Sequence, residues 1–249
     1  MNGRRRFSLA ALAVATLVMG ALPAAAATVS VFDWANGSLA GGPVGWVSIS
    51  VPFDGSNLVE PAPAGFVGQG FGPTSMTHSI GNPASLRISM GDLPTHTSLN
   101  LGFLLAVIDS WDGSSGNWHP DIFNVVLDGT SLYSRTFDNF NTGDQTASTA
   151  NRLSFGTDLG FNTWPDSVYD FQGANGFLNV LHTDSSALIQ FIANGDGWQG
   201  GNDESFGLDK ILVSVNIPDT NVVPEPSTML LLGSGLLGLV GLSRRRRRQ

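Results

Sequence analysis

The 249-residue chain contains no cysteine. This absence excludes disulfide bonds and thiol catalysis, so stability depends on the hydrophobic core and on any bound metal. Basic residues are also scarce away from the two ends. Residues 28–223 contain four basic and 19 acidic residues, which gives a net charge of −15. Such a surface repels nucleic acid and anionic lipid and attracts divalent cations, so nucleic-acid binding is excluded.

Patterns that mark helical, repeat and hydrolytic proteins are missing as well. No sustained 3.6-residue apolar period and no internal repeat occur between residues 28 and 221. This region also has no HExxH and no G-x-S-x-G motif. The four histidines are isolated in the sequence and are interpreted as core or surface residues: His78, His96, His119 and His182. The sequence therefore predicts a non-catalytic protein built from strands.

The amino terminus has the form of an export signal. Three arginines at positions 4–6 precede an apolar stretch at 7–20, and Pro23 is followed by four alanines. This order predicts a signal peptide over residues 1–27. The arginines with Phe7 also resemble a twin-arginine signal, so the general and the twin-arginine export routes both stay open.

The carboxyl terminus carries a three-part pattern. Pro224-Glu225-Pro226 is followed by an uncharged apolar run at 229–242 and then by five arginines at 244–248. As a helix, the run would extend ~21 Å, which is short against a hydrocarbon core of ~30 Å. The arginines resist translocation and hold this end on the cytoplasmic side. The pattern predicts a sorting signal, and a plain C-terminal membrane anchor is the alternative.

In this order of parts, residues 224–249 closely resemble the PEP-CTERM sorting domain of bacterial exported proteins. The resemblance implies that a membrane-embedded exosortase recognises the chain at or near Pro224, Glu225 and Pro226 and removes the apolar helix. It also implies transient membrane anchoring, followed by delivery to the cell surface or to an extracellular polysaccharide matrix. It therefore implies a destination, while the activity must come from the rest of the chain.

The residues between the two signals favour short strands. Gly, Asn, Ser and Thr are abundant, which disfavours helix and favours strands joined by turns. Some eight to ten strands in a domain of about 195 residues predict an all-β, two-sheet antiparallel sandwich, jelly-roll-like, over residues 28–218, with a linker at 219–223. The predicted strands are 28–32, 47–51, 86–90, 98–109, 122–127, 131–137, 168–171, 177–181, 187–193 and 208–217.

The strand at 98–109 is the most apolar. Alternate residues are apolar along its whole length, and both faces are apolar in its second half, which predicts a central strand. Asp128-Gly129 predicts a hairpin turn, and Asp184-Ser185 predicts a turn between the strands at 177–181 and 187–193. Residues 52–83 and 138–166 are expected to be irregular.

Acidic residues gather after the central strand and around the start of the last one. Calcium takes six to eight oxygen ligands, and loops rich in Asp, Asn and Gly supply carboxylates and carbonyls. The sequence therefore predicts a structural calcium site formed by Asp109, Asp112, Asp121, Glu204 and Asp209. The alternative is that these carboxylates only stabilise turns. Residues 204–213 are also similar to the closing strand of carbohydrate-binding jelly rolls, and this resemblance implies that Asp209 holds calcium together with Asp33.

Tryptophans accompany these loops. Trp111 and Trp118 flank the acidic loop, and Trp198 lies in a Gly-rich segment. A loop tryptophan beside Asp and Asn is typical of a sugar site, because the ring packs on the pyranose face while polar groups bind hydroxyls. These three residues are predicted to bind sugar, and the alternative is that their rings close one end of the core.

The function predicted from these features is a non-catalytic carbohydrate-binding or matrix-structural sandwich. Its partners are an exosortase, by resemblance, and extracellular polysaccharide. Two alternatives stay open. One is a secreted polysaccharide-active enzyme that uses the region 109–121, and the other is an adhesin that works by protein contact.

Overall fold

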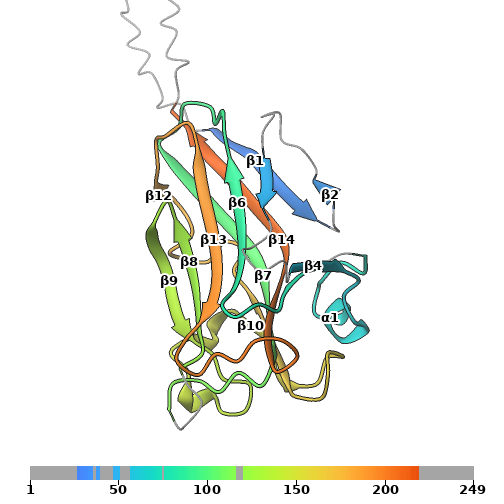
Figure 1. Ribbon diagram of the computed structural model, residues 1–249. Coiled ribbons are helices and arrows are strands. Elements are labelled where there is room, and N and C mark those ends of the chain that lie inside the picture. Colours follow the sequence, from blue (N-terminus) through green and yellow to red (C-terminus); the bar gives the residue numbers. More distant parts are fainter. Residues whose placement is uncertain are drawn as a thin grey trace, which may run out of the picture. The chain divides into compact units, whose positions relative to one another are not determined.

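Two antiparallel sheets carry most of the regular structure (Figure 1). The computed structural model describes residues 27–35, 38–39, 47–50, 57–74, 76–115 and 120–218. The expected two-sheet antiparallel sandwich is confirmed for these residues. The signal peptide, the linker, the apolar run and the sorting motif lie outside them. Among the described residues, no helix is long and apolar enough to cross a membrane.

The larger sheet contains the longest strands. Its main path runs in the order β10 (Arg152–Thr157), β11 (Asp166–Asp170), β7 (Ser98–Asp109), β14 (Glu204–Ile217), β1 (Ala27–Ala35) and β2 (Ser38–Leu39). Three short strands attach to it: β12 (Val180–Leu181) pairs with β7, β5 (Met76–Ser79) pairs with β14, and β4 (Asn57–Glu60) pairs with β5. The predicted central position of the strand at 98–109 is confirmed, because β7 has neighbours on both edges.

The smaller sheet has five strands in the order β3 (Val47–Ser50), β6 (Ala84–Met90), β13 (Ala187–Asn194), β8 (Ile122–Leu127) and β9 (Thr130–Thr136). Burial alternates along β8 and β13, as expected for strands with one face on a core. The turn at Asp128-Gly129 joins β8 to β9, with φ of 48° and 81°, so the predicted hairpin is confirmed.

The main core fills the space between the sheets. It takes the inward residues of β7 and β14 from one sheet and those of β6, β8 and β13 from the other. Phe103 on β7 lies at its centre, with ring centroids 5.0–6.5 Å from those of Phe123, Phe171, Phe177 and Phe191. Through these aromatic contacts, β7 packs against residues of both sheets.

A second, smaller core covers part of the outer face of the larger sheet. Leu104, Ala106 and Ile108 of β7 face outward, and they pack in a cluster that includes Phe66 of the helix α1 (Ala64–Gly68), Phe71 and Met76. This layer explains why the second half of β7 is apolar on both faces. The first half is not covered in this way, and it carries Asn100 and Gly102 on the outer face.

Two expectations about irregular segments are corrected. Residues 52–83 include β4, α1 and β5, and residues 138–166 include β10 and the 3-10 turns η1 (Thr142–Asp144) and η2 (Thr149–Asn151). β4 and β10 are short edge strands, whereas β5 lies between β4 and β14 and pairs with both. The turn at 184–185 connects strands of different sheets, because β12 pairs with β7 while β13 pairs with β6 and β8.

Candidate functional site

Three carboxylates from different parts of the chain meet at one end of the sandwich. Asp112 follows β7, Asp121 immediately precedes β8, and Glu204 begins β14. One carboxylate oxygen from each lies within 4.8 Å of the others. Asp121 and Glu204 are fully buried, and Asp112 is partly buried. The structure therefore brings together three of the five residues predicted to bind calcium.

Backbone amides orient two of these carboxylates. The N–H of Asp112 donates to Oδ2 of Asp121 at 2.6 Å, and the N–H of Gln199 donates to Oε2 of Glu204 at 2.6 Å. The other oxygen of each group, Oδ1 of Asp121 and Oε1 of Glu204, is buried without a hydrogen-bond partner. A buried carboxylate oxygen without a partner is costly, so this pair calls for an explanation.

The electrostatics of the cluster reflect this arrangement. Burial raises the pKa of Asp121 to about 7, and the neighbouring charges of Asp112, Asp138 and Asp203 raise it further against the effect of its backbone hydrogen bond. Burial likewise raises the pKa of Glu204 to about 8, against the effect of the hydrogen bond from the N–H of Gln199, and among the neighbouring charges that of Asp121 raises it most. Without a cation, the ionised forms of these groups are unfavourable.

Asp109 and Asp209 lie outside this group of three and have other partners. Asp109 accepts hydrogen bonds from Asn162 Nδ2 at 2.7 Å and from the N–H of Trp164 at 3.4 Å. Asp209 accepts from the N–H of Gly72 at 2.5 Å and from its neighbour Lys210 at 2.7 Å. Both carboxylates hold loops against the larger sheet. This is the stabilising role that the sequence offered as the alternative to calcium binding. The side chain of Asp33 lies outside the described residues.

The predicted sugar-binding tryptophans lie in the core where the structure describes them. Trp111 is fully buried and donates from Nε1 to the carbonyl of Ser205 at 2.8 Å. Trp198 is 5% exposed, donates to the carbonyl of Gly81, and packs edge-on against Trp111 at 4.9 Å. Neither ring presents a face to solvent on which a sugar could stack, so these two rings close one end of the core. Trp118 lies outside the described residues.

An exposed aromatic pair lies in the neighbouring loops instead. Trp164 is 47% exposed and Phe140 is 49% exposed, with ring centroids 6.1 Å apart. Asp109 holds the loop of Trp164 through the two hydrogen bonds given above, and its own N–H donates to Asp166 Oδ1 at 3.0 Å. This pair offers apolar ring surface at the same end of β7 as the acidic cluster.

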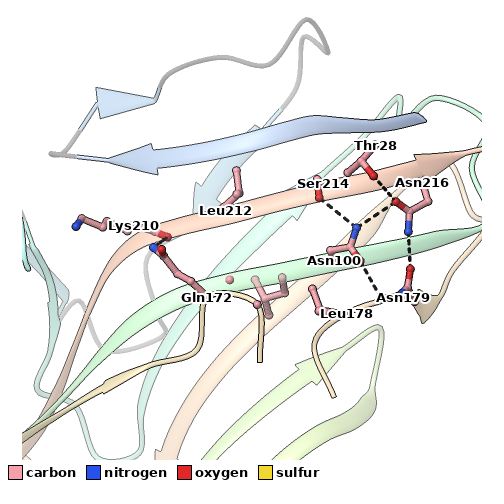
Figure 2. Close-up of a pocket in the computed structure, with 12 residues that line it drawn as sticks. Thr28, Asn100, Gln172, Leu178, Asn179, Lys210, Leu212, Ser214 and Asn216 are labelled. Atoms are coloured by element: carbon pink, nitrogen blue, oxygen red, sulfur yellow. Dashed lines mark hydrogen bonds between the residues drawn. The ribbon is translucent and has the colours of Figure 1, made fainter. Parts of the chain in front are cut away.

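A groove lies on the outer face of the larger sheet, at the half of β7 that carries Asn100 and Gly102 (Figure 2). Its volume is about 570 Å³, which is within the range of small-molecule sites. β7 and β14 form its floor, and the loop between β11 and β12 forms one wall. Its lining residues are Thr28, Asn100, Leu101, Gly102, Gln172, Gly173, Leu178, Asn179, Lys210, Leu212, Ser214 and Asn216.

An amide network fixes one end of this groove. Asn100 donates to Ser214 Oγ and to Asn216 Oδ1, both at 3.3 Å. Asn216 donates to Asn179 Oδ1 at 2.9 Å and accepts from the hydroxyl of Thr28 at 2.8 Å (Figure 2). Asn179 has a φ of 55°, a left-handed conformation that Asn tolerates, and its N–H donates to Asn100 Oδ1 at 2.8 Å. The network links β1, β7, β14 and the loop in fixed positions.

The charge of the groove differs from that of the domain. Among the residues that the structure describes, no Asp or Glu lines it. Its charged lining residue is Lys210, whose amino group points away from the amides in Figure 2. Leu178 and Leu212, 41% and 40% exposed, add apolar surface. The groove therefore combines neutral hydrogen-bonding groups with exposed leucine.

A second groove of about 600 Å³ lies beside β9, with Tyr133, Arg135, Asn151, Asn175 and Phe177 among its lining residues. Its aromatic residues pack on one another, with Tyr133 5.8 Å from Phe177 by ring centroids. These rings contribute to the core, and the groove also carries hydrogen-bonding groups, among them those of Arg135, Asn151 and Asn175.

Two of the histidines form a buried chain that the sequence did not predict. His96 Nε2 lies 2.7 Å from His182 Nδ1, and His182 Nε2 lies 3.0 Å from Asp128 Oδ2. The rings stack at 5.0 Å, and His96 Nδ1 lies 2.6 Å from the carbonyl of Pro94. The chain links the segment before β7 to the β8–β9 turn, so its role here is structural. His119 lies outside the described residues.

Sequence reasoning missed the groove residues Asn100, Asn179 and Asn216 and the aromatic pair. Polar residues at alternate positions of the strands at 98–109 and 208–217 could have indicated a polar outer face on this part of the sheet. Their meeting depends on a strand register that pairs Asn100 with Ser214 and Asn216 with Ser98, which only the structure provides.

By its fold and site geometry, the protein is an all-β antiparallel sandwich with a groove on the larger sheet, lined mainly by uncharged residues. The PEP-CTERM protein-sorting motif matches residues 222–248. The motif marks an exported protein that is sorted to the cell surface after transient membrane anchoring, and it is a substrate signal for exosortase. The resemblance stated from Pro224, Glu225 and Pro226 is thereby confirmed.

Comparison with curated proteins gave no match. Among solved structures, the chain is similar to a family GH115 4-O-methyl-α-glucuronidase with specificity for decorated arabinogalactans (13% identity, TM-score 0.31, 81% of this chain and 19% of that one). It is also similar to the Agl-KA catalytic domain (11%, 0.29, 81% and 30%) and to a structure of infectious bursal disease virus, Gt strain (14%, 0.28, 74% and 35%). The chain thus spans about a third or less of each structure, and at these TM-scores the similarities carry no argument about function.

Proposed function

We propose that the protein is a non-catalytic polysaccharide-binding module that export and sorting place on the cell surface or in the extracellular matrix. The groove on the outer face of the larger sheet carries this proposal. A sugar chain offers hydroxyls that both donate and accept hydrogen bonds, together with apolar C–H surface. Fixed amides beside exposed leucines match both properties.

The rigidity of the amides supports binding. Because Asn100, Asn179 and Asn216 hold one another, a ligand does not have to order them, and the entropic cost of binding is reduced. The lining residues that the structure describes include no carboxylate, which favours an uncharged ligand, while the net charge of −15 repels polyanions elsewhere on the domain. We therefore assign neutral polysaccharide to the groove.

A polysaccharide-active enzyme remains the rival proposal. Paired carboxyl groups are the machinery of glycosidases, and the acidic cluster contains them. A catalytic pair must reach its substrate, however, and both Asp121 and Glu204 are fully buried. Their burial favours binding without catalysis.

Retention of the full chain, purified in mild detergent, on neutral polysaccharide from the producing cells tests the proposal. Asn179→Ala and Leu212→Ala change exposed groove residues and should weaken retention by about tenfold or more, with the fold intact by circular dichroism. Asn175→Ala, in the second groove, is the matched control and should bind as wild type. If the wild type is not retained, the binding proposal is wrong and the protein-contact adhesin is favoured.

Two further outcomes separate the alternatives. If Trp164→Ala abolishes retention while the groove variants do not, the sugar site lies at the exposed aromatic pair and the groove assignment is wrong. If the wild type releases soluble sugar and Asp112→Asn stops the release, the protein is an enzyme.

A further inference from the structure

We propose that Asp112, Asp121 and Glu204 bind one calcium ion, which joins the two sheets at this end of the sandwich. Asp112 and Glu204 belong to segments of the larger sheet, and Asp121 enters the smaller sheet through β8. One ion between them links both layers. The inference is independent of the sugar groove, because none of the three residues lines it.

The spacing of the three groups suits calcium. Calcium–oxygen distances are about 2.3–2.6 Å, so two ligands on opposite sides of one ion lie about 4.6–5.2 Å apart. The three carboxylate oxygens lie within 4.8 Å of one another, and one ion can therefore contact all of them. Water and backbone carbonyls, which calcium accepts readily, complete the coordination.

The two oxygens without partners provide the independent reason for a ligand. Backbone amides bind Oδ2 of Asp121 and Oε2 of Glu204, which leaves Oδ1 and Oε1 as the buried oxygens without a hydrogen bond. Carboxylates that only stabilise turns use their oxygens for such bonds, as Asp166 does with the N–H groups of Asp109 and Leu159. Since one oxygen of each of the three carboxylates lies within 4.8 Å of the others, a single cation is a partner that can satisfy the buried pair.

The choice of calcium follows from the donors and from the destination of the protein. The three donors named are hard oxygen atoms, and hard oxygens suit calcium or magnesium rather than zinc. Magnesium keeps several of its waters, whereas a buried group of protein carboxylates removes them. An exported chain without cysteine also has no disulfide to join its layers, and a metal supplies that link.

Calcium titration of the full chain, stripped of metal and kept in mild detergent, tests the proposal. We expect the melting temperature to rise by about 5–10 °C at a calcium concentration about 100 times the dissociation constant. Magnesium at the same concentration should produce a much smaller rise. No rise with calcium, or an equal rise with magnesium, overturns the calcium assignment.

Three variants locate the ion. Asp121→Asn and Glu204→Gln should abolish the calcium-induced rise and should melt at or above the wild type in chelator, because each removes a repulsive buried charge. Asp209→Asn changes another fully buried carboxylate away from the cluster, and it should melt lower in both conditions while keeping the calcium-induced rise. A rise that survives in Asp121→Asn and Glu204→Gln places the ion elsewhere and overturns the proposal.

A measurement on the wild type alone keeps the proposal testable if the variants fail to fold. Terbium replaces calcium and luminesces when a nearby tryptophan is excited. Trp111 adjoins Asp112, and Trp198 adjoins Gln199, whose N–H binds Glu204. Terbium luminescence excited through tryptophan and displaced by calcium is expected, and its absence overturns the site.

Discussion

The backbone N–H of Asp112 donates a 2.6 Å hydrogen bond to Oδ2 of Asp121, so one acidic residue of the cluster orients the carboxylate of another. This contact fixes the direction of Asp121 and leaves its second oxygen unpaired. The loop after β7 therefore holds the carboxylate of Asp121 in a buried position, and the stability of the protein should depend on whether that carboxylate is ionised.

In the metal-free protein, stability should fall as the pH rises. Burial raises the pKa of four carboxyl groups to between about 6 and 8: Asp109, Asp121, Asp166 and Glu204. In the unfolded chain these groups titrate near pH 4. The folded state therefore binds more protons between about pH 4 and pH 8, and the free energy of unfolding decreases across that window, by at most about 1.4 kcal/mol per pH unit for each group.

Chemical denaturation in chelator, repeated from about pH 5 to about pH 8, measures this slope. Saturating calcium should make the slope shallower, because the ion stabilises the ionised forms of Asp121 and Glu204. A flat or rising profile in chelator would contradict the expected protonation of the buried groups.

Two glycines in α1 should respond oppositely to alanine. A Cβ on Gly65 would lie 2.4 Å from the carbonyl oxygen of Leu159, so Gly65→Ala forces α1 away from the loop between β10 and β11 and should cost about 1–3 kcal/mol. A Cβ on Gly68 meets nothing within 4 Å, and Gly68→Ala should leave stability unchanged or raise it by up to about 1 kcal/mol. Urea denaturation of the two variants compares them, and equal effects would mean that α1 does not dock on Leu159.

The fold was largely predictable because strands such as β8 and β13 alternate in burial and β7 is apolar along its length. The apolar run of β7 and the Asp128-Gly129 turn between β8 and β9 are local sequence patterns. The structure confirms both the strand and the hairpin. The strands β4, β5 and β10 were missed because short strands gain their stability from pairing and packing in the sheet rather than from their own sequence.

The candidate site was less predictable, because it depends on register and loop closure. Asp112 and Asp121 were grouped because they are close in the sequence, and Glu204 was added because it lies in a second acidic segment. Asp209 was grouped with them as well, but its carboxylate binds the N–H of Gly72 instead. Trp111 was expected to face a sugar because it follows an acidic turn. Its burial comes from packing against Trp198, 87 residues later in the chain, and no local pattern encodes that contact.

Phe103 should be among the most sensitive residues of the core. Its ring contacts aromatic residues of both layers and is fully buried, so Phe103→Ala should destabilise the protein by about 3–5 kcal/mol through lost contacts and an added cavity. Phe140→Ala, at a residue that is 49% exposed, is the matched control and should change stability by less than about 1 kcal/mol. Similar losses in urea denaturation would show that the core is not centred on Phe103.

The sorting motif makes a prediction that does not depend on the sandwich. Residues 222–248 match the motif, and Pro224, Glu225 and Pro226 are its recognition residues by resemblance. Glu225→Ala together with Pro226→Ala should leave the protein in the membrane fraction at its unprocessed mass, because recognition fails while the apolar run remains. The wild type and the linker variant Asp219→Asn should reach the surface or extracellular fraction at lower mass. Immunoblots of fractionated producing cells measure both properties. Equal fractionation and equal mass in all three proteins would favour a plain C-terminal anchor, since an anchor is retained by the apolar run whether or not the Pro-Glu-Pro is intact.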